Sequence, residues 1–152
     1  MSKNEEIKML IRIAEKKDSP IIAMLAQKMW DHGADELSEE FESLIGSKDA
    51  AVFVAEEKET LIAFAQCQLR HDYVEGTESS PVGYLEGIFV EETFRHQGVA
   101  SRLLSACEQW AREKGCSEFA SDCELSNTDS LRFHLALGFT EANRIICFSK
   151  TL

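Results

Sequence analysis

The sequence predicts a mixed α/β domain in which a central, mostly antiparallel sheet is flanked by helices. Two short apolar segments in the first half, 51–55 and 61–69, are separated only by a polar turn and predict an antiparallel hairpin. In the second half, strand-like segments alternate with helical ones. A length of 152 residues is typical of one domain, so we assign residues 1–152 to a single unit.

The chain before the hairpin predicts one strand and two helices. Apolar residues alternate with others over 7–14, which is the period of a strand. Ser19 is a candidate N-cap, Pro20 fits the first helical position, and helical spacing continues to Trp30. A second, acidic helix follows at 35–45, with its apolar residues on one face.

The chain after the hairpin supplies the elements around which a site can form. A twelve-residue loop at 71–82 has neither helical nor strand periodicity, and loops of this length are often functional. Strands are predicted at 84–90, 116–122 and 145–150, and helices at 98–114 and 127–137.

Composition and charge exclude several classes of partner. With 44% hydrophobic and 28% charged residues, the chain has a globular rather than a disordered composition. The net charge of −11 argues against a nucleic-acid or anionic-membrane partner, because phosphate binding needs a basic face. No apolar run approaches the length of a membrane span. Met1–Glu6 contains no apolar core of a secretory signal.

The cysteine pattern indicates reduced thiols and no metal site. The five cysteines are an odd number without paired metal-ligand spacing. We therefore expect a cytoplasmic protein whose cysteines are mostly structural.

The stretch 83–102 carries the strongest functional signal. An apolar strand containing one carboxylate, Glu86, is followed by a turn at 95–100 and then by a helix. Amide groups at the start of a helix bind anions, and small residues such as Gly98 let a phosphate group reach them. Arg95 adds a permanent positive charge. The turn matches neither the dinucleotide fingerprint nor a Walker loop.

The pattern Arg95-x-x-Gly98-x-Ala100 after a strand resembles the pyrophosphate loop of the GCN5-related N-acetyltransferase (GNAT) superfamily. A later helix ending in Gly138-Phe139 is similar to its second cofactor motif. The resemblance implies acetyl-coenzyme A as co-substrate, with its pantetheine arm on a central strand that splays from the next one. The cofactor-binding residues that it implies are Ile88, Phe89, Val90, Arg95, His96, Gln97, Gly98, Val99, Ala100, Asn127 and His134. Asn127 is equally a good N-cap.

Longer strings at consistent spacing, 70–77, 79–82, 85–90 and 120–122, resemble one branch, the aminoglycoside 6′-N-acetyltransferases. This resemblance implies acetylation of the 6′-amino group of an aminoglycoside antibiotic by direct attack in a ternary complex, and hence antibiotic resistance. It also implies a homodimer in which an exchanged C-terminal strand places 145–150 at the interface. An acidic protein suits a polycationic substrate, although acidity also serves solubility.

Two carboxylates are the candidate catalytic residues, Glu86 and Asp122. A carboxylate inside an apolar strand is costly unless it is paired or functional. From the residues alone, Glu86 is either catalytic or an outward-facing residue with a Lys or Arg partner, and Asp122 is either catalytic or a turn residue. The resemblance implies that both contact the substrate amines, while amides around Ile88 and Phe89 hold the thioester oxygen.

Four more residues match substrate-contacting positions of that branch. Trp30 and Tyr73 match aromatic residues at such positions, and His32 matches a His. Trp30 also fits a core role, and His32 also fits a plain loop role. Asn143 stands where the branch often has Glu, which removes one carboxylate from the substrate site. His134 stands where the superfamily often has a Tyr proposed to protonate the thiolate, which leaves the acid unassigned.

Two other functions stay open from the sequence. An N-acetyltransferase of the same fold can act on a polyamine, an amino acid or a protein N-terminus. A non-catalytic coenzyme A sensor keeps the phosphate loop but does not need the carboxylate pair. The loop 71–82, together with Glu86 and Asp122, favours the aminoglycoside enzyme.

Overall fold

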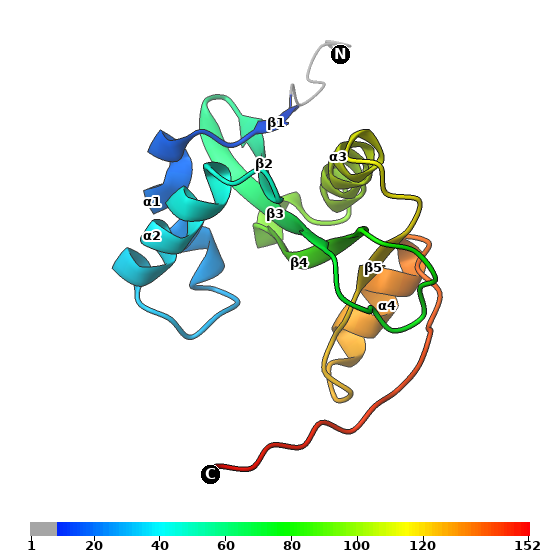
Figure 1. Ribbon diagram of the computed structural model, residues 1–152. Coiled ribbons are helices and arrows are strands. Elements are labelled where there is room, and N and C mark those ends of the chain that lie inside the picture. The colour runs from blue at the N-terminus through cyan, green and yellow to red at the C-terminus, as the bar shows by residue number, and fades with distance from the viewer. Residues whose placement is uncertain (1–8) are drawn as a thin grey trace.

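A twisted sheet with the strand order β1-β2-β3-β4-β5 forms the centre of the molecule (Figure 1), a computed structural model that describes residues 9–152. Its strands are β1 (Met9–Ile13), β2 (Ala50–Glu57), β3 (Thr60–Arg70), β4 (Val82–Val90) and β5 (Phe119–Ser121). Neighbouring strands from β1 to β4 are antiparallel, and β5 is parallel to β4. The predicted hairpin and the mixed, mostly antiparallel sheet are therefore confirmed.

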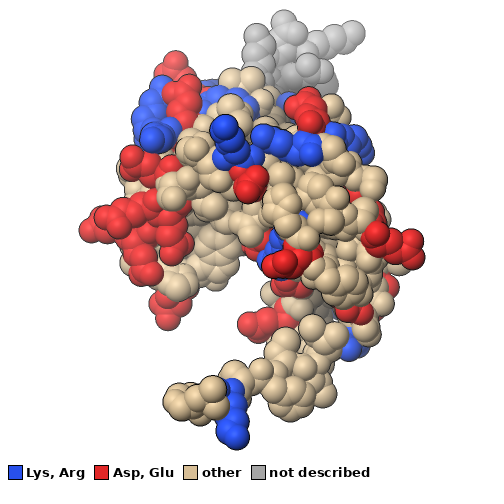
Figure 2. Space-filling model, viewed as in Figure 1, with Lys and Arg blue, Asp and Glu red and all other residues tan. Residues whose placement is uncertain are grey.

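Helices cover both faces of this sheet. The helices are α1 (Ser19–Ala26), α2 (Ala34–Ile45), α3 (Val99–Glu113) and α4 (Thr128–Ala136), with short 3₁₀ turns at Lys16–Asp18 and Glu92–Phe94. Figure 1 shows α1 and α2 on one face, α3 on the other, and α4 beside β5. Acidic side chains gather over α2 in Figure 2, as the sequence of that helix predicts.

Successive residues of the central strands point to opposite faces, and both faces are buried. Val52, Val54 and Phe64 join the core under α1 and α2, where Phe41 is 1% exposed. The small residues Ala51, Ala55, Ala63 and Ala65 face the other way, toward Leu103 and Cys107 of α3. Small side chains on this face let α3 approach the sheet closely.

An ion-pair cluster fixes the first strand. Arg12 donates to both oxygens of Asp18, at 2.8 and 3.0 Å, and to Glu56 at 3.0 Å. The backbone amide of Glu15 also donates to Asp18, at 2.8 Å. These bonds, led by those from Arg12, hold the pKa of Asp18 below its usual range. The cluster ties β1 to β2 and to the start of α1.

Several predicted boundaries near the N-terminus change in the structure. Residues 7 and 8 of the first predicted strand, and Met1–Glu6, lie outside the described residues. Ser19 is not the N-cap, because Asp18 holds that position and Ser19 is the first helical residue. The first helix ends at Ala26 instead of continuing to Trp30, which lies in the turn that follows.

Two predicted strands at the C-terminal side are shorter or absent in residues 9–152. The strand expected at 116–122 is paired only over Phe119–Ser121, because β4 and β5 part after Leu85. The strand expected at 145–150 is wrong for this isolated chain: the tail runs away from the body without a ladder (Figure 1). A strand needs a neighbouring edge, and none within the described chain pairs with this segment.

Candidate functional site

The turn predicted to bind pyrophosphate begins α3. Gly98 is the N-cap of the helix with a φ of +80°, in the left-handed region that glycine adopts without strain. The amides of the first turn that follow have no partner inside the helix and are available to an anion. Arg95 donates to the carbonyl of Val90 at 2.9 Å, so it ties the turn to the end of β4. The predicted phosphate loop thus has the required backbone geometry.

The splay that the resemblance implies is present between β4 and β5. Pairing covers Gly83–Leu85 on β4, and the later part of β4 is hydrogen-bonded only to β3 among the described strands. The edge of β4 that faces away from β3 therefore has no strand partner at Ile88–Val90, although the Val90 carbonyl accepts from Arg95, and such an edge can bind an extended amide-containing chain. Ser121 bridges the point of divergence, since its hydroxyl lies 3.2 Å from the carbonyl of Leu85.

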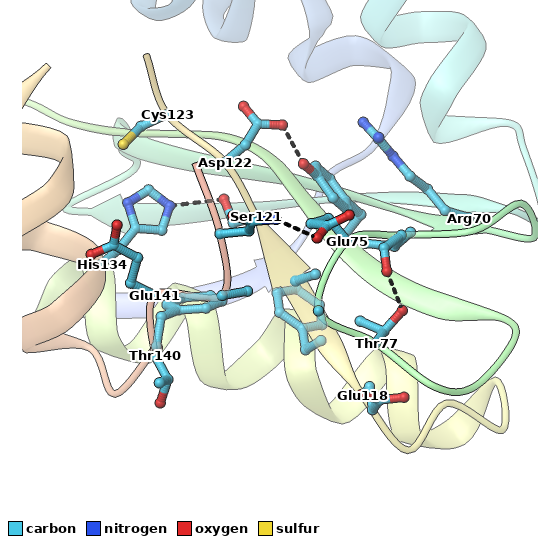
Figure 3. Close-up of a pocket in the computed structure, with 18 of the residues that line it drawn as sticks. Arg70, Glu75, Thr77, Glu118, Ser121, Asp122, Cys123, His134, Thr140 and Glu141 are labelled. Atoms are coloured by element: carbon cyan, nitrogen blue, oxygen red, sulfur yellow. Dashed lines mark hydrogen bonds between the residues drawn. The ribbon is translucent and has the colours of Figure 1, made fainter. Parts of the chain in front are cut away.

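His134 lies beside this opening on α4 (Figure 3). Its Nε2 is 2.8 Å from the hydroxyl of Ser121, and its Nδ1 is 2.7 Å from the carbonyl of Ser130. A carbonyl only accepts, so Nδ1 carries a hydrogen and orients the ring. Asn127 caps α4 by accepting from the amide of Ser130 at 3.1 Å, so its N-cap role is confirmed.

A small pocket of about 230 Å³ brings together three of the predicted residues, Trp30, His32 and Glu86. Leu37, Glu40 and Gln66 complete its lining. Trp30 also packs on the aromatic core, with ring centroids 6.4 Å from Phe41 and 6.1 Å from Phe64. The core role of Trp30 is therefore confirmed, and the indole also forms part of the pocket wall, while its contact with a substrate stays a prediction.

The other predicted catalytic and substrate-binding residues, Tyr73, Asp122 and Asn143, line a second, larger hollow of about 1440 Å³, which Figure 3 shows in part. Asp122 lies at its edge, at the end of β5. Tyr73 and Asn143 meet on Glu75, which accepts from the tyrosine hydroxyl at 3.4 Å and from the Asn143 amide at 2.8 Å. Glu75 is therefore a carboxylate next to Asn143 that the sequence reading missed.

Two residues that the sequence did not single out connect the catalytic candidates. Arg70 binds the carboxylate of Glu86, with the closest contact at 2.9 Å. Glu86 therefore has the Lys or Arg partner that was expected if it were an outward-facing strand residue. Tyr84 donates its hydroxyl to Asp122 (Figure 3). Burial, with the hydrogen bond to Asp122, raises the pKa of Tyr84 far above its usual range. The position of Tyr84 beside the site could have been predicted from the sequence, because it lies two residues before Glu86 on the same strand face.

Metal ligands, membrane-spanning helices and thiols are the other features of residues 9–152 that bear on the kind of site. No group of three or more His, Cys, Asp or Glu side chains within 9–152 has the arrangement of a metal site. Among the helices of that region, none has the length and apolar character to span a membrane. All five cysteines are free thiols, and Cys67, Cys107 and Cys116 are buried.

The fold and the phosphate loop define the class of protein. The sequence profile of the acetyltransferase (GNAT) family matches residues 13–139, which is most of the chain. The protein therefore belongs to the acetyltransferase (GNAT) family, and the predicted fold is confirmed.

Relatives narrow the resemblance to one group of enzymes. The aminoglycoside N(6′)-acetyltransferase type 1 of Serratia marcescens is 43% identical over 130 residues, which are 84% of this chain and 89% of that protein. The enzyme of the same name from Stenotrophomonas maltophilia is 38% identical over 142 residues, 93% of each chain. The predicted resemblance to this branch is confirmed.

Solved structures of aminoglycoside acetyltransferases are also similar to this chain. The aminoglycoside N-acetyltransferase AAC(6′)-Iy in complex with CoA superimposes with a TM-score of 0.94 at 38% identity, covering 99% of this chain and 100% of that chain. AAC(6′)-Iy in complex with a bisubstrate analogue, CoA-S-monomethyl-acetylneamine, gives a TM-score of 0.89 at 40% identity, over 95% and 99% of the two chains.

Proposed function

We propose that this protein transfers the acetyl group of acetyl-coenzyme A to the 6′-amino group of aminoglycoside antibiotics and thereby confers resistance to them. The observation that carries the proposal is the pocket that unites Trp30, His32 and Glu86 beside the open edge of β4. It occurs in a chain that resembles enzymes of that name over 93% of its length. The net charge of −11 adds long-range attraction for a polycation.

In the proposed mechanism the antibiotic and the thioester meet in one ternary complex. The loop amides at 96–100 hold the pyrophosphate, and the open edge of β4 binds the pantetheine arm. Glu86, directly or through water, takes a proton from the 6′-ammonium group, and Asp122 holds a neighbouring amine. The free amine then attacks the thioester carbon: a C–N bond forms, the C–S bond breaks, and the thiolate leaves with the electron pair. The thiolate takes up, directly or through water, the second proton that the new amide nitrogen releases. Amides near Ile88 and Phe89 hold the developing oxyanion.

The test is thiol release from acetyl-coenzyme A by the purified protein with kanamycin or tobramycin, compared with spermidine and a peptide amine. The proposal predicts a rate that depends on the aminoglycoside and exceeds the rates with the other amines. A rate only with spermidine or the peptide would keep the fold and the co-substrate and overturn the substrate. Binding of coenzyme A without turnover of any amine would favour the sensor function.

We further propose that the enzyme is a homodimer in which the C-terminal tail of each copy completes the sheet of the other. Four apolar side chains of the tail are exposed: Ile145 by 68%, Ile146 by 80%, Phe148 by 90% and Leu152 by 110%. Two segments line much of the larger hollow: residues 116–125, which include β5, and residues 137–145, which follow α4. The hollow therefore lies along β5. A strand from a second copy, laid in this hollow, would bury the exposed apolar groups and pair the free edge of β5.

The oligomeric state tests this arrangement by size-exclusion chromatography with light scattering. The proposal predicts a dimer for the unaltered protein and a monomer for Phe148→Ser combined with Ile146→Ser. The matched control is Lys150→Ser, which alters an exposed polar residue of the same tail. A monomer across the whole micromolar range, or a dimer that the double substitution leaves intact, would overturn it.

A cytoplasmic location completes the proposal. The free thiols, two of them on exposed residues, Cys123 and Cys147, suit a reducing compartment. Localisation of a tagged copy by cell fractionation tests it, and recovery of the protein outside the cytoplasm would contradict it.

A further inference from the structure

We propose that Arg70 and Tyr84 are positioning residues, which hold Glu86 and Asp122 in fixed orientations for the amines of the substrate. The inference rests on the function proposed above. Its basis is a continuous set of contacts, Glu86–Arg70–Tyr84–Asp122, which joins the small pocket to the larger hollow.

Arg70 selects which oxygen of Glu86 remains available. Its Nη2 and Nε donate to Oε1 at 2.9 and 3.2 Å, and Nη2 also contacts Oε2 at 3.1 Å. A carboxylate has about four acceptor positions, so these contacts fill both on Oε1 and leave about one on Oε2. The amine or a bridging water then finds a single, directed acceptor. A lysine at this position is a point charge and cannot reproduce the planar, two-nitrogen contact.

Tyr84 connects this pair to the second carboxylate. The guanidinium carbon of Arg70 lies 3.5 Å from the centre of the Tyr84 ring, close enough for stacking. The residue is only 6% exposed and lies in the middle of the sheet, opposite Gln68 of β3 and Ala120 of β5. The ring is therefore a rigid support. Its hydroxyl stays protonated, as its raised pKa requires, and donates to Asp122.

The charges of these side chains predict a kinetic difference between loss of positioning and general disruption of the site. Glu86 and Asp122 together carry −2, and Arg70 reduces the sum of the three groups to −1. Removal of the guanidinium thus leaves a more negative site, which attracts a polycation more strongly. The same removal frees Glu86 to rotate. Loss of orientation affects the transition state and appears in kcat, whereas loss of attraction appears in KM.

The experiment measures tobramycin-dependent thiol release and acetyl-coenzyme A binding for Arg70→Met, Arg70→Lys and Tyr84→Phe. We expect Arg70→Met to lower kcat on the order of 10- to 100-fold, with the KM for tobramycin unchanged or reduced and acetyl-coenzyme A affinity unchanged. Arg70→Lys should restore little of kcat. Lys17→Met removes the same unit of charge from a side chain that is 75% exposed, and it should behave as the wild type.

A double-variant comparison ties the effect to Glu86. If Arg70 acts through Glu86, Arg70→Met added to Glu86→Gln lowers kcat little further. Two independent, multiplicative losses would overturn the inference, as would Arg70→Met with a raised KM and an unchanged kcat. Circular dichroism checks folding, and Tyr84→Phe, which keeps the buried ring, carries the test if Arg70→Met does not fold. No tobramycin-dependent rate in the wild type would overturn the proposed function instead.

Discussion

The close contact between Gly87 and Trp30 allows the sharpest prediction. Gly87 lies in β4, one residue after Glu86, and the indole of Trp30 lies against its backbone. A Cβ atom at this position would lie 2.5 Å from Cζ2 and 2.6 Å from Cη2 of Trp30. The absence of a side chain at Gly87 is therefore what lets the indole form a wall of the pocket.

The size of the effect follows from that geometry. Ordinary carbon contacts are about 3.5–4.0 Å, so the indole of Trp30 must move by about 1 Å in Gly87→Ala. Overpacking of this kind costs about 1–3 kcal/mol, and each kcal/mol lowers the Tm of a chain of this size by roughly 2–4 °C. The displaced indole also alters the pocket, so we expect kcat/KM for the aminoglycoside to fall about tenfold or more.

Thermal unfolding and steady-state kinetics on the same preparations measure both effects. Trp30→Phe removes the two atoms that the added methyl group meets, so Gly87→Ala should destabilise a Trp30→Phe background much less than the wild type. Gly46→Ala is the matched control. Its Cβ would have only contacts of 3.7 Å, and its φ of −83° suits alanine.

Two results would refute this reasoning. One is a Gly87→Ala protein that is as stable and as active as Gly46→Ala. The other is an equal loss of stability in the wild type and in the Trp30→Phe background, which would show that the cost does not come from the indole.

Three further predictions concern other parts of the molecule. The pKa of Asp18 is lowered by Arg12 in the folded protein. The stabilisation by Asp18 is therefore fully present above the unfolded pKa of about 3.9 and is lost as the pH falls through the folded pKa. Urea midpoints measured against pH should show that acid lowers the stability of the wild type more steeply than that of Asp18→Asn. Glu86→Ala should lower turnover far more than acetyl-coenzyme A affinity, and equal losses in kinetics and calorimetry would count against its role. Arg95→Ala should weaken acetyl-coenzyme A and spare the aminoglycoside, whereas unchanged coenzyme A affinity would show that the loop is misassigned.

Features that depend on neighbouring residues were accessible from the sequence. The turn before α3 required a glycine at a left-handed position, and Gly98 has that conformation. The Asn127 cap and the hairpin between β2 and β3 also arise from short-range chemistry. The grouping of Trp30, His32 and Glu86 came from the family resemblance, since no periodicity connects residues so far apart.

Features that depend on pairing between distant parts of the chain could not be predicted from the sequence. The contact between Arg70 and Glu86 requires the β3–β4 register, which shifts between Gln66 and Cys67. Glu40 and Gln66 enter the pocket from α2 and β3, and nothing in their local sequence indicates it. The predicted strand at 145–150 is wrong for a related reason: a short apolar run favours an extended segment, but its local sequence does not indicate which strand edge would pair with it.

The central claim is that the site acetylates one particular amine, the 6′-amino group. The most direct measurement compares thiol release with tobramycin and with an analogue that carries a hydroxyl at the 6′ position and keeps the other amines. We predict a tobramycin-dependent rate that disappears with the analogue, because the nucleophile is then missing from the position beside Glu86. Equal rates with both compounds would show that another amine is acetylated and would contradict the proposed geometry of the site.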